Sequence, residues 1–380
     1  MRGHLRLAGL LLFAWCACLH AEIVVGINLS ASGSGAHQGE PAKQAVLLWP
    51  RTLGDEIAHY ILLDDASDPT IAGQNIERLL NEQQVDVIVG PTSPHAQSVA
   101  TPLAQRAEIP MLSLSATAPA RLPWIYPVVP ARSLATNAIA RHMQHSGANR
   151  VAFLGLANPY GNDWYEHLQQ SAQDAGLTIV VDERYRLGET SLSGHALRVL
   201  EFAPDAVFVG DTGAAAALAV KALRERGFVG AIYATSDAAV PEFLQAVDPT
   251  VIEGVHLPVV PAIIARDLPA QHPARDVAQD FVERYEARYG TGSVMPAASD
   301  AWSAWVWLNS AVRRAKNAGA QPGSPEFRAA LARALDDTRK LAVPNGVLSA
   351  DPPPGHPRYD EHAYIVTSVR NGRLAPAEPA

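Results

Sequence analysis

The sequence predicts an α/β protein with two lobes, each a parallel β-sheet flanked by helices, and three observations lead to this prediction. Short apolar runs rich in β-branched residues alternate with helical patterns over most of the chain, which is typical of βαβ units. Two proline-punctuated extended segments, 125–132 and 255–261, interrupt the alternation, and the βα series restarts after the first of them. The chain has 380 residues, which is more than one domain usually contains.

The individual elements follow from the spacing of the apolar residues. The segments predicted as strands are 23–29, 60–63, 85–89, 111–114, 151–156, 178–181, 206–209 and 231–234. The segments predicted as helices are 40–49, 70–81, 95–107, 134–145, 162–175, 194–202, 214–226, 276–289, 297–316 and 325–335. The two interrupting segments are interpreted as crossings between the lobes. Near the end, the apolar segment 363–370 stops at Asn-Gly, which predicts a β-hairpin.

The first 21 residues are predicted to be a secretory signal peptide. A basic start is followed by an apolar run over 7–19 and then by a small residue before a polar one. The run is too short to span a membrane as a helix of the mature protein. The leader predicts export, and because both cysteines, Cys16 and Cys18, lie in it, we expect no disulfide in the mature protein. Lipid attachment to one of these cysteines is the alternative to simple cleavage.

Charge and motif content argue against several classes of function. The net charge is −8 and no basic cluster is present, which argues against binding of nucleic acid or anionic membranes. Asp64, Asp65 and Asp68 lack the spacing of a calcium loop, and Asp68 is expected to cap a helix that starts at Pro69. The sequence contains neither a zinc-binding motif nor a nucleophile elbow. We therefore expect no metal, no cofactor and no enzymatic activity.

Two turns that follow successive predicted strands form the predicted ligand site. The segment 90–94 reads Gly-Pro-Thr-Ser-Pro, and the segment 115–117 reads Ser-Ala-Thr. Both are interpreted as strand-to-helix turns, whose hydroxyls and free N–H groups attract anions such as carboxylates. In open α/β sheets, ligands bind outside the carboxyl ends of the strands. The alternative interpretation is that Ser93 and Thr117 are only helix N-caps.

Several short motifs occur in a characteristic order along the chain. They are 64–69 (Asp-Asp-Ala-Ser-Asp-Pro), 89–93 (Val-Gly-Pro-Thr-Ser), 110–117 (Pro-Met-Leu-Ser-Leu-Ser-Ala-Thr), 160–161 (Tyr-Gly), 299–302 (Ser-Asp-Ala-Trp) and 346–351 (Gly-Val-Leu-Ser-Ala-Asp). In this order the chain resembles the substrate-binding proteins of ABC importers for branched-chain and hydrophobic amino acids, the leucine/isoleucine/valine-binding family. The resemblance covers nearly the whole mature chain.

The resemblance implies a particular architecture, the type I periplasmic-binding fold. Two Rossmann-like lobes are then joined by three crossings. Lobe 1 comprises 22–131 and 262–344, and lobe 2 comprises 132–261 and 345–380.

The resemblance also implies a function in transport. It implies a monomeric periplasmic protein that captures a small, partly apolar ligand and delivers it to an ABC permease in the inner membrane. The ligand would be a branched-chain or other hydrophobic amino acid, or a related carboxylate or amide. Two alternatives stay open: a periplasmic sensor or regulator on the same fold, and a carrier of an apolar ligand that is not an amino acid.

The resemblance further implies which residues bind the ligand. The Ser-Ala-Thr turn matches the family's carboxylate-binding turn, whereas Pro94 stands at the position of the other usual serine, one residue after Ser93. An acidic residue that reads the ammonium group would fall at Ser236 or Asp237, and Asp237 is the only carboxylate there. The residues expected to bind the ligand are Ser93, Ser115, Ala116, Thr117, Tyr160, Asp211, Thr212, Ser236 and Asp237.

Aromatic residues are expected both at the cleft and in the core. Tyr160 matches an aromatic residue that flanks the ligand, and Trp164 follows it by one helical turn, so both are expected to line the cleft. Trp302, Trp305 and Trp307 lie on an apolar helix and are expected in the core instead.

Overall fold

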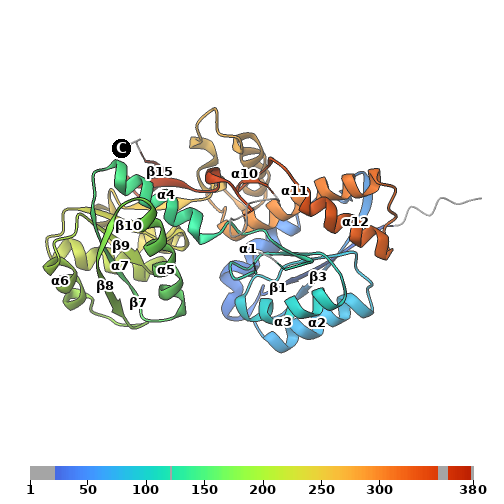
Figure 1. The fold of residues 1–380 in the computed structure, drawn as a ribbon, viewed down its shortest axis with the longest axis horizontal. Helices are drawn as coiled ribbons and strands as arrows, with labels where there is room; N and C mark the ends of the chain where they lie inside the picture. Colours follow the sequence, from blue (N-terminus) through green and yellow to red (C-terminus); the bar gives the residue numbers. More distant parts are fainter. Residues whose placement is uncertain (1–21, 120–121, 350–357, 378–380) are drawn as a thin grey trace, which may run out of the picture.

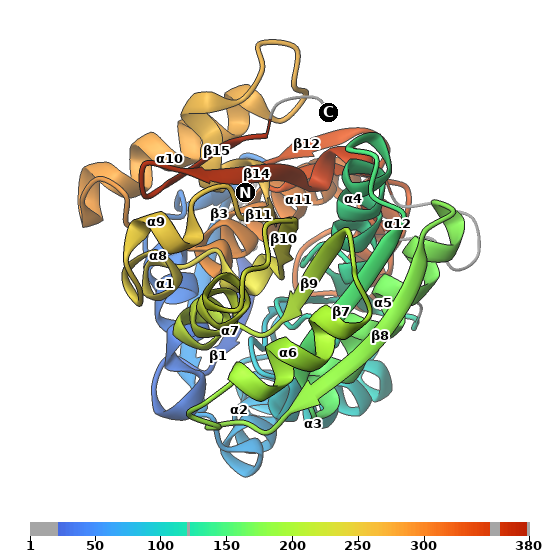
Figure 2. The same ribbon diagram turned by 90° about the vertical axis from the view of Figure 1, so that its left-hand side faces the viewer.

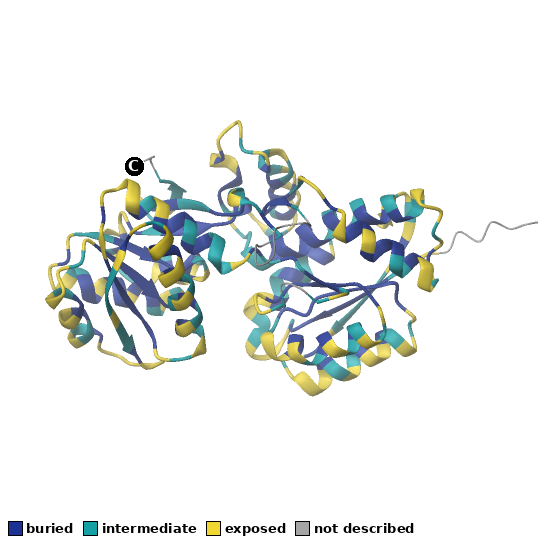
Figure 3. Ribbon diagram, in the orientation of Figure 1, coloured by how far each residue is buried: buried dark blue, intermediate teal, exposed yellow. Residues whose placement is uncertain are grey.

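The computed structural model describes residues 22–119, 122–349 and 358–377 and shows two lobes side by side (Figure 1). Each lobe is a mostly parallel β-sheet flanked by helices, so the predicted fold class is confirmed. The sheets are the most deeply buried layer of each lobe (Figure 3). The predicted leader, 1–21, lies outside the described residues.

Lobe 1 is built on the six-stranded sheet with the order β2-β3-β1-β4-β5-β6. Its strands are β1 (Ile23–Leu29), β2 (Thr52–Leu53), β3 (Glu56–Asp64), β4 (Val87–Val89), β5 (Met111–Ser113) and β6 (Ile125–Pro127). All pair in parallel except β2, which is antiparallel to β3. Helices α1 (Ala36–Val46), α2 (Pro69–Asn81) and α3 (Pro94–Arg106) connect the strands.

The sheet of lobe 1 is buried on both faces, as the continuous apolar runs predict. On β4, Val87 and Val89 join the large core that includes α1, whereas Ile88 joins a separate core with α2 and α3. Helix α2 begins where the sequence indicates, because the Asp68 carboxylate accepts hydrogen bonds from the backbone N–H groups of Thr70 and Ile71. The predicted capping role of Asp68 is thereby confirmed.

Lobe 2 is built on the seven-stranded sheet with the order β15-β14-β11-β10-β9-β7-β8 (Figure 2). Its strands are β7 (Arg150–Leu156), β8 (Thr178–Tyr185), β9 (Ala206–Gly210), β10 (Ala231–Ala234), β11 (His256–Val259), β14 (Ile365–Arg370) and β15 (Arg373–Pro376). Its helices are α4 (Arg132–His145), α5 (Pro159–Asp174), α6 (Ser193–Glu201) and α7 (Gly213–Glu225), with the short α8 (Pro241–Gln245) and α9 (Pro249–Ile252). The predicted C-terminal hairpin is β14–β15, and it extends this sheet in antiparallel fashion.

The chain returns to lobe 1 between these two parts of lobe 2. Helices α10 (Arg275–Tyr289), α11 (Pro296–Asn317) and α12 (Pro325–Asp336) match the predicted helices to within one or two residues. Helix α11 packs on α1 and α12 and buries Trp302 and Trp307 almost completely, as expected. The hairpin of β12 (Leu341–Val343) and β13 (Gly346–Leu348) follows. Short 3₁₀ turns are η1 (Gly33–Gly35), η2 (Ser236–Ala238), η3 (Pro261–Asp267) and η4 (Glu361–Ala363).

Both segments interpreted as crossings contain a strand that the sequence did not predict. Residues 125–127 form β6 and pair with β5, and 256–259 form β11 beside β10 and β14. Pro127 is tolerated because β6 is the edge strand of its sheet, where a missing N–H costs little. Within the described part of the chain, no helix combines the length and apolar character required to cross a membrane.

A histidine pair lies inside lobe 2, between β11 and α4. The rings of His142 and His256 are 4.6 Å apart, and His142 Nδ1 lies 2.8 Å from the hydroxyl of Tyr233. Burial, and then the nearby His142, lowers the pKa of His256 to about 4. The folded protein therefore keeps His256 neutral at pH values where the unfolded chain is already protonated.

We expect the free energy of unfolding to fall as the pH drops from about 6.5 towards 4, since only the unfolded chain gains this proton there. The contribution of His256 to this loss is at most about 3 kcal/mol. Urea unfolding at several pH values should therefore give a flatter profile for His256→Gln than for the wild type. The exposed His95, changed to Gln, is the control. Identical pH profiles for wild type and His256→Gln would contradict this account.

Candidate functional site

A cavity of about 620 Å³ lies between the two lobes. Lobe 1 contributes the starts of α1, α3 and α11 and the turn after β5, and lobe 2 contributes the starts of α4 and α5 and the segments after β9, β10 and β11. These segments follow the carboxyl ends of parallel strands or begin helices, where open α/β sheets bind ligands. The location therefore agrees with the predicted cleft.

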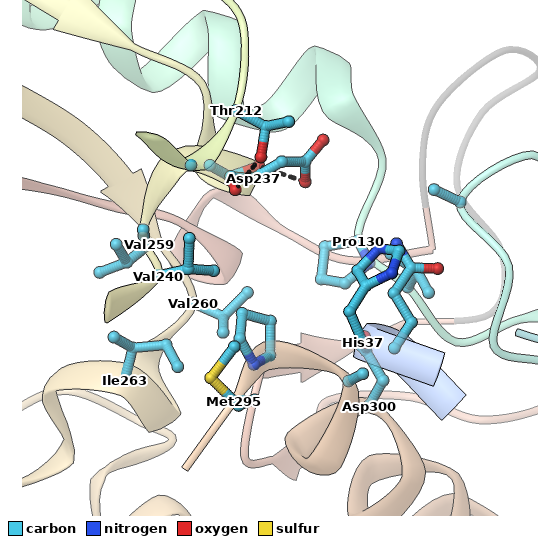
Figure 4. A pocket seen from close by; sticks show the side chains of 18 of the residues that line it. His37, Pro130, Thr212, Asp237, Val240, Val259, Val260, Ile263, Met295 and Asp300 are labelled. Atoms are coloured by element: carbon cyan, nitrogen blue, oxygen red, sulfur yellow. Dashed lines mark hydrogen bonds between the residues drawn. The ribbon is translucent and has the colours of Figure 1, made fainter. Parts of the chain in front are cut away.

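One part of the cavity wall is apolar. Val240, Val259, Val260, Ile263 and Met295 lie together on one side of the view in Figure 4. They come from lobe 2, from the second crossing and from the residue before α11. Such a surface favours the apolar part of a small ligand, since burying it there removes apolar area from water.

A fixed positive charge, Arg132, stands at the start of α4 in the wall. Its Nη1 lies 2.5 Å from Asp163 Oδ2, and its Nη2 lies 3.6 Å from Asp237 Oδ2. The guanidinium carbon is 5.6 Å from the ring centres of both Tyr160 and Trp164. Burial alone would lower the pKa of Arg132, but Asp237 and Asp163 outweigh it and raise the pKa. Arg132 is therefore charged, with two carboxylates matching its charge.

Asp237 faces the cavity from η2 (Figure 4). Its backbone carbonyl accepts a hydrogen bond of 2.6 Å from the Thr212 hydroxyl, and the Ser236 hydroxyl donates to its Oδ1 at 3.4 Å. Its side chain remains 43% exposed, which leaves carboxylate surface for a ligand. Thr212, Ser236 and Asp237 thus form a connected polar wall after two neighbouring strands.

Tyr160 lies in the wall beside this group. Its hydroxyl donates to Thr235 Oγ1 at 3.2 Å, and Thr235 donates to the carbonyl of Asp211 at 2.7 Å. Burial, followed by the charge of Asp237, raises the pKa of Tyr160 well above its ordinary value, so the hydroxyl stays protonated. Gly161 allows α5 to approach β7 closely, because a Cβ there would lie 2.0 Å from the carbonyl oxygen of Leu156.

Trp164 does not line the cavity, contrary to the prediction. It is fully buried behind Tyr160, with its ring centre 5.8 Å from that of Phe208 in the core. The sequence places Tyr160 and Trp164 one turn apart on α5, and the helix begins so that the first faces the cavity and the second faces the sheet. Trp164 therefore supports the wall without forming its surface.

The structure brings some of the expected ligand-binding residues to the cavity and leaves others outside its wall. Those in the wall are Ala116, Tyr160, Thr212, Ser236 and Asp237. Those outside it are Ser93, Ser115, Thr117 and Asp211. Pro94, which stands where the family pattern has a serine, is in the wall.

Each residue outside the wall has a local partner. The Ser93 hydroxyl accepts from Ala96 N at 3.3 Å and caps α3, so the N-cap interpretation holds for Ser93. The Asp211 carboxylate accepts from the hydroxyl of Tyr185 at 2.7 Å and is buried.

The turn at 115–117 differs from the interpretation as a helix start. Ser115 Oγ lies 3.0 Å from Thr117 Oγ1, and the residues described between this turn and β6 form no helix. Thr117 is consequently neither a helix N-cap nor at a helix terminus. Its side chain is exposed next to Ala116, at the edge of the cavity.

Sequence reasoning missed six polar wall residues: His37, Gln38, Arg132, Glu242, Asp300 and Tyr364. Arg132 lies at the end of the first crossing and Tyr364 at the start of the predicted hairpin segment 363–370, where no strand-turn pattern marks a site. Asp300 belongs to the Ser-Asp-Ala-Trp helix start, which served only as a marker of the fold. Among the residues that the structure describes, no group of three or more His, Cys, Asp or Glu side chains is placed to hold a metal ion.

Comparisons with known proteins identify the family and agree with the two-lobe fold. Residues 22–373 match the family described as periplasmic binding protein. An extracellular ligand-binding receptor from Rhodopseudomonas palustris HaA2 is 35% identical, with a TM-score of 0.77, and the match covers 94% of this chain and 100% of that chain. A comparison with curated protein sequences gave no match.

Two more distant solved structures share the fold. LivJ, a branched-chain amino acid transporter substrate binding protein from Streptococcus pneumoniae in complex with isoleucine, is 19% identical, with a TM-score of 0.72 and coverage of 94% and 99%. A solute binding protein of an ABC transporter from R. palustris in complex with benzoate is also 19% identical, with a TM-score of 0.68 and coverage of 95% and 98%.

Proposed function

The chain belongs to the periplasmic binding protein family, and from this premise we propose that it captures a small, partly apolar ligand between its lobes for delivery to an ABC importer. The protein then acts in the periplasm, as a monomer, after removal of the predicted leader. Delivery requires contact with a permease in the inner membrane.

The observation that carries this proposal is that the cavity wall combines an apolar surface with two side chains of opposite charge. Valines, Ile263 and Met295 offer an apolar surface, while Arg132 and Asp237 offer charges of opposite sign. A hydrophobic amino acid carries the same combination, an apolar side chain beside a carboxylate and an ammonium group. Because Asp237 faces the cavity, an amino acid of the leucine type is the leading ligand class.

Two distant relatives of the same fold support a ligand of this general kind. One holds isoleucine and the other benzoate, so this fold accepts both amino acids and apolar carboxylates. A thermal-shift screen should therefore compare hydrophobic amino acids, their deaminated carboxylates and neutral amides. We expect at least one hydrophobic amino acid to raise the melting temperature, since a ligand that binds only the folded state stabilises it. A screen in which none of the three sets stabilises the protein would contradict the proposed function.

Binding is proposed to close the lobes about crossings near Ala131, Pro261 and Pro344. The proposed lobes are 22–131 with 262–344, and 132–261 with 345–380. Wall residues come from both lobes, so a ligand gains more contacts when the lobes approach, and this difference favours the closed form. Hinge closure around a ligand is a well-established motion of periplasmic binding proteins as a class.

Thr117 is proposed to bind the ligand carboxylate once the lobes close. Thr117 is exposed next to the wall residue Ala116, so closure can bring its side chain to the ligand. Thr117→Ala should then cost about 1.5–3 kcal/mol of binding free energy, the usual value for a hydrogen bond to a charged group. Calorimetry with the stabilising amino acid measures this. Unchanged affinity in a folded variant would reject this role for Thr117.

A further inference from the structure

A second carboxyl group, that of Asp300, lies in the cavity wall opposite Asp237. It belongs to the second turn of α11 in lobe 1, whereas Asp237 belongs to η2 in lobe 2. Figure 4 shows the two residues at different sides of the cavity, with Val260 and Met295 among the apolar residues to the left of both. Asp300 is only 8% exposed, so it is far more buried than an ordinary surface carboxylate.

The charges around the cavity are not balanced. Among the described wall residues, Arg132 is the one lysine or arginine, and Asp163 and Asp237 place two carboxylates beside its single positive charge. Asp300 and the exposed Glu242 are further carboxyl groups in the same wall. A ligand with only a negative charge would meet this excess of carboxyl groups, whereas a ligand with a positive charge would compensate it.

The surroundings of Asp300 favour its neutral form in the empty site. Burial raises its pKa well above the ordinary value, the hydrogen bond of 2.7 Å from Asn345 Nδ2 opposes this shift, and the charge of Asp237 adds to it. Tyr359 and Tyr364 also face this group, and both stay protonated because burial raises their pKa values. The remaining charged or titratable wall groups are Arg132, Tyr160, Glu242 and His37 on other elements.

We propose that Asp300 is a second specificity-determining carboxyl group, which acts with Asp237 to hold the positively charged group of the ligand between the two lobes. This inference rests on the proposed function and adds a selection rule to it: the ligand must carry an ammonium or similar cation. When the cation arrives, the Asp300 carboxylic acid loses its proton to water, and the carboxylate pairs with the cation. Binding at neutral pH then releases protons.

The test uses three probes of one shape: leucine, isocaproate, which lacks the ammonium group, and isoamylamine, which lacks the carboxylate. Calorimetry in two buffers with different ionisation enthalpies measures both affinity and proton release. We expect leucine to bind the wild type with proton release and more tightly than isocaproate. Asp300→Asn should weaken leucine and isoamylamine by at least about tenfold, abolish the proton release, and leave isocaproate almost unchanged.

Asp276→Asn is the matched control, because it makes the same change at an exposed position of α10 outside the cavity wall. Asp300→Asn should fold, since an amide replaces a neutral acid of the same shape, and its melting temperature without ligand checks this. Unchanged leucine affinity and unchanged proton release in Asp300→Asn would overturn the role of Asp300 and leave the proposed function standing. If isocaproate binds the wild type as tightly as leucine, the proposed selection for a positively charged ligand is overturned. Capture of an apolar carboxylate would still be supported. If none of the three binds, both the leucine-type ligand and the role of Asp300 fall.

Discussion

Asp237→Asn is expected to weaken binding of a hydrophobic amino acid by about a hundredfold. In the proposed closed form, Asp237 and the ligand's ammonium group are an enclosed charge pair, and removing one partner of such a pair costs about 2–5 kcal/mol because the remaining charge is left without compensation. Asp237 faces the cavity and lies within 3.6 Å of Arg132, so the substitution also leaves Arg132 with one carboxylate fewer. Calorimetry with the amino acid identified by thermal shift measures the loss.

Two controls distinguish the loss of the contact to the ligand's ammonium group from a general effect of changing a wall carboxylate. Glu242→Gln removes another wall carboxylate, and we expect only a small change for it because Glu242 is exposed. The deaminated analogue of the ligand should lose little affinity in Asp237→Asn. Amino-acid binding that survives Asp237→Asn unchanged would refute the ammonium-reading role of Asp237.

Trp164→Ala should lower the free energy of unfolding by about 3–5 kcal/mol, the range for removal of a fully buried large aromatic side chain. Trp164 is fully buried, and its ring packs against Phe208 at 5.8 Å and Tyr160 at 6.5 Å. Because it also lies under Arg132, its loss should additionally weaken ligand binding. Urea unfolding, together with calorimetry of the folded variant, measures both effects.

Trp164→Phe is the matched variant, since it retains an aromatic ring and leaves a smaller cavity. It should cost clearly less than Trp164→Ala and preserve the position of Tyr160. If Trp164→Ala unfolds at the same urea concentration as the wild type, then the side chain does not support the core of lobe 2 as described.

The sequence predicts the fold well where local pattern and tertiary packing agree. Strand β1 matches its predicted bounds because it is buried on both faces, so its apolar run has no polar interruption. Strands β6 and β11 escaped prediction because their prolines mark a break locally. Pairing with strands distant in sequence makes them strands nevertheless, and a sequence pattern does not contain that information.

The same distinction applies to the site. The resemblance to the family pointed to Thr212, Ser236 and Asp237, and the structure brings them together in the wall because residues that follow parallel strands meet at one edge of a sheet. Asp300 reaches the cavity only because α11 packs on α1, which depends on contacts across the whole lobe. Trp164 shows the opposite case, a residue predicted in the cleft that lies in the core. Its spacing of one helical turn from Tyr160 was predicted correctly, but its side chain packs on Phe208 and does not face the cavity.

Small-angle scattering with and without ligand tests the central claim most directly, namely that one ligand is held between two lobes that close on it. The ligand is the amino acid that gives the largest thermal shift, and the protein is saturated with it. The account predicts that the radius of gyration falls on saturation, because wall residues of both lobes then contact the same molecule. A radius of gyration that stays the same at saturation would contradict closure and indicate a rigid pocket instead.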